Sequence, residues 1–121
     1  MRHPQKTLEV RIKRAYEPSS PHDGVRVLVD RLWPRGVSKS DAAIERWMKE
    51  IAPSAQLRRW FGHDPARWNE FQHRYRGELE GKTELLRELR GMGRDRALTL
   101  VYSAHDEQHN QAVVLRDLLL H

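Results

Sequence analysis

Residues that could transfer a proton or bind an anion follow directly after an apolar run at residues 25–29, whose composition indicates a buried β-strand. Asp30 and Arg31 stand at the end of this run, and Arg35 follows shortly after them. In parallel sheets, ligands bind beyond the carboxyl ends of the strands. Asp30 could act there as an acid or base, while the two arginines could hold an anion. The structural alternative is an internal Asp30–Arg31 pair that only fastens the loop.

A second apolar run, at residues 97–102, also ends in a polar and ionisable stretch. Because this stretch precedes the last predicted helix, its backbone N–H groups could form an anion site. Ser103 and Asn110 could add contacts to a ligand, and His109 could serve as an acid or base. Plain capping of the last helix by Ser103 and Asp106 is the alternative. The two strand ends form one site only if their loops meet.

Basic and aromatic residues alternate at residues 57–63, as they do in proteins that bind single-stranded nucleic acid. Helical spacing of the aromatic residues that follow favours core packing instead. Arg58 and His63 flank the apolar positions and are candidates for a wall of the site. His105 and His109 have the spacing of a helical zinc motif, but an aspartate stands where that motif has its glutamate. We therefore predict no metal and no cofactor.

The composition limits the class of protein. With 121 residues the chain is expected to form a single domain, and no apolar run approaches the ~20 residues of a membrane span. Residues 1–6 lack the core of a signal peptide, so we expect a cytoplasmic protein. The absence of cysteine excludes disulfides and thiolate catalysis. The net charge of +5 favours an anionic partner, although a generally arginine-rich composition would produce the same charge.

Hydrophobic periodicity predicts the elements that must position these residues. Strands are predicted at 8–13, 25–31 and 97–102. Helices are predicted from a serine cap near residue 40 to Pro53, from Ser54 to Gly62, from Asp64 to Gly81, around residues 85–89, and from the Ser103 cap through Leu119. This order predicts an α/β fold with a small three-stranded, mostly parallel sheet packed by about five helices. The second and third strands should be parallel, while the direction of the first stays open because a hairpin is possible.

Several motifs resemble the YeaO-like family of bacterial domains of unknown function. They lie at residues 29–36, 52–54, 60–65, 102–104, 106–107 and 109–110. The resemblance implies an α/β fold and brings no established reaction with it. Some members of the broader superfamily have Cys-His-Arg near the place of His109 and Asn110, and thiol chemistry of that kind cannot apply to a chain without cysteine. Similar sequences often have lysine at the place of His105, which makes His105 a poor candidate for catalysis.

The leading hypothesis is a cytoplasmic enzyme or ligand-binding domain for a phosphate-bearing small molecule or nucleotide. The candidate residues are Asp30, Arg31, Arg35, Arg58, His63, Ser103, His109 and Asn110. In this hypothesis, Arg31, Arg35 and the start of the last helix hold the anion. Asp30 and His109 exchange protons, and the remaining polar side chains orient the ligand. An enzyme of this kind would hydrolyse a phosphoester or transfer a group.

Two other classes of function stay open at this stage. A nucleic-acid-binding or regulatory module would use its arginines on the phosphate backbone, and its affinity would fall steeply with salt. A partner-binding subunit would use Trp33 or Trp60 as an exposed anchor. The oligomeric state cannot be inferred from these patterns.

Overall fold

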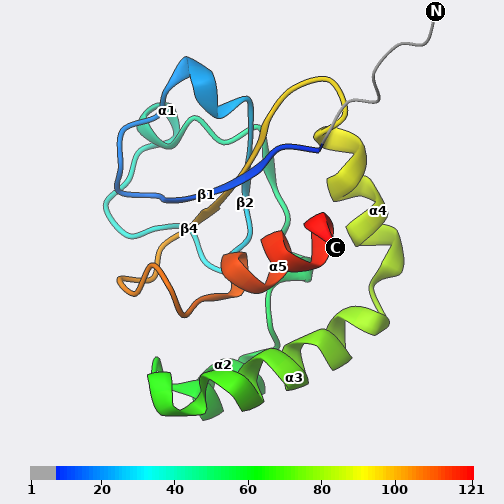
Figure 1. Cartoon of the computed structure of the whole chain (residues 1–121). Helices are drawn as coiled ribbons and strands as arrows, with labels where there is room; N and C mark the ends of the chain where they lie inside the picture. Colours follow the sequence, from blue (N-terminus) through cyan, green and yellow to red (C-terminus); the bar gives the residue numbers. More distant parts are fainter. Residues whose placement is uncertain (1–7) are drawn as a thin grey trace, which may run out of the picture.

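Within residues 8–121, four parallel strands form the sheet that organises the fold (Figure 1). The computed structural model describes residues 8–121, so the chain start that was used above to predict localisation lies outside the described residues. The strands are β1 (Val10–Arg14), β2 (Val25–Leu28), β3 (Arg46–Trp47) and β4 (Leu98–Tyr102), in the order β1-β4-β2-β3. Every pairing is parallel, including that of β1 with β4. The predicted α/β class is confirmed, with four strands instead of three and no hairpin between β1 and β2.

Among the described residues, five α-helices accompany the sheet. They are α1 (Lys39–Ala42), α2 (Ala55–Phe61), α3 (Trp68–Glu80), α4 (Thr83–Met92) and α5 (Gln111–Leu120), with short 3-10 helices at Pro21–Asp23, Lys49–Ile51 and Pro65–Arg67. Helix α5 packs on β1 and β4, α3 packs against α5, and α2 packs against α3 (Figure 1). Among residues 8–121, no helix is long and apolar enough to cross a membrane.

The prediction of a long helix ending before Pro53 was wrong. Helix α1 ends after one turn at Ala43, whose left-handed φ of 49° cannot continue a helix. The chain then adds β3 to the open edge of β2, where the N–H of Met48 donates to the carbonyl of Leu28 at 2.9 Å. Met48 is fully buried in this arrangement, so the apolar spacing that suggested a helix also suits a strand followed by a tight turn. Long-range pairing decided between the two.

Strands β2 and β4 are buried along their whole length, as expected of central strands in a parallel sheet. The larger core joins the sheet to α2, α3, α4 and α5, and Phe61, Phe71 and Tyr75 form a continuous run of aromatic contacts within it. A smaller apolar cluster, built around Leu28 and Val101, is covered by Trp33, Ile44 and Trp47. The sheet is therefore packed by apolar side chains on both of its faces.

A buried ion cluster joins β1 and β2 to the short 3-10 helix between them. Asp23 accepts hydrogen bonds from the Arg26 guanidinium at 2.7 Å, from the Lys13 ammonium at 3.1 Å and from the backbone N–H of Ser20 at 3.0 Å. The Nε of Arg26 donates to the carbonyl of Ala42 at 2.9 Å. Burial raises the pKa of Asp23, but these hydrogen bonds and the Lys13 charge outweigh it and lower the pKa below the ordinary 3.8. The carboxylate is therefore charged at neutral pH and joins three segments of chain.

Candidate functional site

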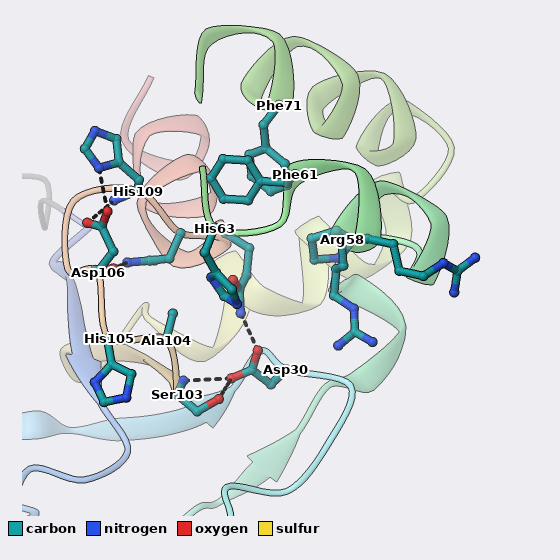
Figure 2. Close-up of a pocket in the computed structure, with 14 residues that line it drawn as sticks. Asp30, Arg58, Phe61, His63, Phe71, Ser103, Ala104, His105, Asp106 and His109 are labelled. Carbon is teal, nitrogen blue, oxygen red and sulfur yellow. Dashed lines mark hydrogen bonds and ion pairs between the residues drawn. The ribbon is translucent and has the colours of Figure 1, made fainter. Parts of the chain in front are cut away.

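The two strand-end loops meet at Asp30. Its Oδ2 accepts hydrogen bonds from the backbone N–H of Ser103 at 2.8 Å and from the Ser103 hydroxyl at 2.9 Å, as Figure 2 shows. Its Oδ1 accepts from the side-chain amide of Gln111 at 2.5 Å. The carboxyl ends of β2 and β4 lie side by side because the strands are parallel neighbours. Asp30 thus joins the end of β2, the end of β4 and the first turn of α5.

The Asp30 carboxyl is largely shielded from solvent and already engaged. Burial raises its pKa above the ordinary 3.8, while the hydrogen bonds from Ser103 and Gln111 and the charge of Arg58 lower it in part. Its main-chain carbonyl also accepts from the Trp47 indole at 2.7 Å. A carboxyl held by three donors suits the positioning of loops better than proton transfer to a ligand.

The raised pKa of Asp30 predicts a specific dependence of stability on pH. A carboxyl whose folded-state pKa exceeds its unfolded value favours folding at low pH, and this contribution is lost as pH rises through the folded-state pKa. We expect the stability of the native chain, relative to Asp30→Asn, to decline as the pH rises above 3.8. Denaturant unfolding of both proteins across acidic pH measures this difference. A difference that stayed constant or rose over that range would contradict the prediction.

A pocket of about 690 Å³ opens beside Asp30. Its walls come from the loop after β2, the loop between β4 and α5, the start of α5, helix α2 with the residues after it, and α3 (Figure 2). Phe61 and Phe71 form an apolar side, with their rings stacked 4.3 Å apart between centroids. This volume lies in the range of pockets that enclose whole small organic molecules.

Helix α2 supplies the cationic wall of the pocket with Arg58 and Arg59. Among residues 8–121, neither guanidinium has a carboxylate within ion-pair distance. The Ser54 side chain caps α2 by accepting from the N–H of Leu57 at 3.1 Å, and the Ser54 hydroxyl donates to Glu78 of α3 at 2.6 Å. These bonds brace the helix that carries the two arginines.

His63 enters the same pocket from the chain just after α2. Gly62 and His63 both adopt left-handed φ angles, 55° and 57°, which turn the chain sharply at the helix end. Glycine accepts this conformation freely, whereas a left-handed residue with a side chain costs roughly 1 kcal/mol. Backbone strain of this kind is concentrated at functional sites. The turn brings the His63 ring next to Phe61, 6.4 Å between centroids.

The loop between β4 and α5 contains a His–Asp pair on the pocket wall. Asp106 accepts from the backbone N–H groups of Gln108 at 2.9 Å and His109 at 3.0 Å, and it lies 2.8 Å from Nδ1 of His109. The backbone bond from Gln108, followed by the bond to the His109 ring, lowers the pKa of Asp106. Trp68 packs edge-on against the His109 ring. With Nδ1 engaged, Nε2 is the His109 nitrogen that a ligand can use.

The predicted cap of the last helix was wrong. Helix α5 begins at Gln111, and its cap is Asn110, whose Oδ1 accepts from the N–H of Val113 at 3.2 Å. Asn110 also donates to the carbonyl of Asp106 at 2.8 Å, so its side chain is engaged within the protein. Ser103 instead donates its N–H and its hydroxyl to the Asp30 carboxyl. The intervening loop forms its own turn around Asp106, which a local capping pattern cannot reveal.

The structure brings some predicted residues together and leaves others apart. Asp30, Arg58, His63, Ser103, His109 and Asn110 line the pocket. Arg31 instead donates from Nε to the carbonyl of Pro53 at 2.9 Å, and so fastens the loop without pairing with Asp30. Arg35 is exposed outside the pocket, and its carbonyl accepts from the Tyr16 hydroxyl at 3.2 Å.

Sequence reasoning overlooked two pocket residues that bear on the chemistry. Arg59 directly follows Arg58 within the same basic and aromatic stretch at residues 57–63, so the sequence did offer a signal for it. Gln111 carried no comparable signal, because its contact with Asp30 depends on where α5 begins. Among residues 8–121, no group of three His, Cys, Asp or Glu side chains could hold a metal ion.

Comparison with known proteins places the chain in a family. The family described as "Inactive DUF488-N3 subclade" matches residues 9–121. The uncharacterized protein YeaO of Escherichia coli is 40% identical over 112 residues, which cover 93% of this chain and 97% of YeaO. The uncharacterized protein Rv3073c of Mycobacterium tuberculosis is 43% identical over 110 residues, covering 91% and 92% of the two chains. No solved structure matches significantly. The chain therefore belongs to the YeaO-like family, within the group described as the inactive DUF488-N3 subclade.

Proposed function

We propose that this protein is a small ligand-binding domain whose pocket takes up an anionic, phosphate-bearing molecule. The observation that carries the proposal is the pair Arg58 and Arg59, which line a pocket of about 690 Å³ without a carboxylate partner among residues 8–121. Guanidinium groups bind phosphate through charge-assisted, bidentate hydrogen bonds. His63 and Nε2 of His109 add polar contacts to the same pocket. The proposal retains the cytoplasmic location expected from the sequence.

The contacts favour a protein that binds its ligand without converting it chemically. Asp30, the candidate acid or base, has both carboxyl oxygens engaged by Ser103 and Gln111. The family description "inactive" points the same way. His109, held by Asp106, remains as a polar contact for the ligand.

Nucleic acid is the weaker alternative because much of the positive surface charge is neutralised locally. Exposed ion pairs join Arg46 to Glu88, Arg74 to Glu70, Arg87 to Glu84 and Arg96 to Glu45. A phosphate backbone would have to compete with these carboxylates. A partner-binding role has no stronger support, because both tryptophans considered as anchors are engaged within the protein. The Trp33 indole donates to the carbonyl of Val37, and two guanidinium groups stack on the Trp60 ring.

The test compares Arg58→Gln with Arg76→Gln. Both substitutions remove one positive charge, but Arg76 lies exposed on α3 and is not a pocket residue. Isothermal titration with AMP, ribose 5-phosphate and inorganic phosphate would give the affinities. We expect Arg58→Gln to weaken binding of the best of these probes by about tenfold or more, the usual size of one charged hydrogen bond. Arg76→Gln should leave the affinity within a factor of about two.

Salt dependence separates the two functions. Binding in a partly enclosed pocket should survive moderate salt, whereas backbone binding to an oligonucleotide should fall steeply. Titrations at low and high salt would include short single- and double-stranded oligonucleotides. Binding confined to oligonucleotides, erased by salt and weakened equally by both substitutions, would replace the proposed function with nucleic-acid binding.

A further inference from the structure

Opposite charges lie at the two ends of the pocket. Arg58 lies at one end, and Asp106 with its neighbour His109 lies at the opposite end, as Figure 2 shows. Phe61 and Phe71 form an apolar wall between the two ends. A ligand whose phosphate is bound at the arginine end therefore directs the rest of its body toward Asp106.

The Asp106 carboxylate is held in place by its own loop and keeps an acceptor position free. Its Oδ1 accepts from the N–H groups of Gln108 at 2.9 Å and His109 at 3.0 Å, while its Oδ2 lies 2.8 Å from Nδ1 of His109. A carboxylate can accept about four hydrogen bonds, so Oδ2 has room for another donor. The bond from the Gln108 N–H, followed by the contact with the His109 ring, lowers the pKa of Asp106. The group is therefore negatively charged at neutral pH.

Asp30, the other carboxyl that lines the pocket, lies in a different electrostatic setting. Burial raises its pKa, and the charge of Arg58 is among the influences that offset this rise. Ser103 and Gln111 donate to its two oxygens. By contrast, no lysine or arginine among residues 8–121 lies within ion-pair distance of Asp106. Asp106 is thus the pocket carboxylate that a cationic group of a ligand can approach away from the arginines.

We propose that the ligand is a phosphorylated amine, whose phosphate is bound by Arg58 and Arg59 and whose ammonium group, at the other end of the molecule, donates to Asp106. This inference rests on the proposed function. The ammonium group supplies a donor for the free position on Oδ2, and the opposite charges of the ligand match those of the pocket. The carbon body between the charges lies along Phe61 and Phe71, whose rings would give neither charge a hydrogen-bond partner.

The experiment compares 6-aminohexyl phosphate with 6-hydroxyhexyl phosphate by isothermal titration at neutral pH. The two compounds differ only in their terminal group, and an alkyl amine is charged at this pH because its pKa is close to that of lysine, about 10.4. Since the Asp106 side chain is 31% exposed, we expect the amine to bind about fivefold more tightly, the upper range for a partly exposed ion pair. 2-Aminoethyl phosphate should show no preference over 2-hydroxyethyl phosphate, because its amine stays beside its phosphate.

Three variants locate the group that recognises the amine. Asp106→Asn keeps an oxygen for the N–H groups of Gln108 and His109 but removes the charge, and it should reduce the preference for the six-carbon amine to within about twofold. Asp95→Asn removes the same charge from an exposed residue that does not line the pocket, and it should leave the preference unchanged. Arg58→Gln should weaken both six-carbon compounds by a similar factor, because they share the phosphate.

The outcomes separate this inference from the proposed function. If AMP or ribose 5-phosphate binds but the six-carbon amine binds no more tightly than its alcohol, recognition of an amine is wrong while anion binding stands. The same conclusion follows if the preference survives in Asp106→Asn, or if the two-carbon amine shows it equally. If no phosphate compound binds the folded chain, the proposed function and the inference are both wrong. A preference that is confined to the six-carbon pair and lost in Asp106→Asn, but not in Asp95→Asn, supports both.

Discussion

Asp30→Ala is expected to lower the free energy of unfolding by about 3 kcal/mol, because it leaves several shielded donors without an acceptor. The N–H and hydroxyl of Ser103 and the amide of Gln111 all lose the carboxyl to which they donate. For a domain of this size, such a loss corresponds to a drop in melting temperature of roughly 10 °C. Chemical denaturation measures the first quantity and differential scanning calorimetry the second.

The same substitution should also abolish ligand binding, since Asp30 joins three walls of the pocket. Asp30→Asn keeps one carbonyl oxygen for Ser103 and should cost less, about 1 kcal/mol. Asp95→Ala, at an exposed position, is the matched control and should change stability by less than about 0.5 kcal/mol. If Asp30→Ala proved as stable as the native chain while binding was lost, Asp30 would act on the ligand directly and its positioning role would be wrong.

Asp23→Ala is expected to cost about 4 kcal/mol, because it leaves the buried Arg26 guanidinium without its counter-charge. Arg26 is 3% exposed and Asp23 5% exposed, so water cannot replace the lost partner. Lys13 also loses its carboxylate, although its side chain is partly exposed and can turn its charge toward solvent. Because the pKa of Asp23 is lowered, its contribution should also be lost in the native chain as pH falls below 3.8.

A double variant makes this second prediction sharper. In Asp23→Leu with Arg26→Met, both buried charges are replaced by apolar side chains, which is often tolerated where a single replacement is not. We expect the double variant to be more stable than Asp23→Ala in urea denaturation. Ligand affinity should change little in the folded protein, because neither residue lines the pocket. A cost below about 1 kcal/mol for Asp23→Ala would show that the cluster adds little net stability.

Part of the candidate site could be predicted because it depends on patterns that are local in the sequence. The apolar runs that become β2 and β4 are each followed by a polar residue, and parallel strands bring such ends to one edge. The contact between Asp30 and Ser103 follows from that rule. The choice among arginines did not follow, because a long side chain can bind a ligand or a backbone carbonyl equally well. Arg31 binds the carbonyl of Pro53, while Arg58 lines the pocket.

The errors of the fold prediction have one physical origin, which is competition between local and distant hydrogen-bond partners. The apolar residues between positions 44 and 51 have the spacing of a helix. Residues 46–47 within this stretch nevertheless pair with the open edge of β2 as a strand. Ser103 and Asp106 have the spacing of a helix cap, yet the Ser103 hydroxyl donates to Asp30 at the end of the neighbouring strand. Asn110 caps the helix instead. In both cases a partner distant in the sequence displaced the local one.

By itself, the amino-acid sequence determined the α/β class, the two central strands and the strand-end position of the candidate site, because burial and turn signals act over a few neighbouring residues. Only the tertiary structure decided that β3 exists, that α5 begins at Gln111 and that Arg58 and Arg59 face the pocket. Those features depend on which backbone groups and side chains still lack a partner once the sheet has formed. Contacts between segments that are distant in the sequence decide which groups these are.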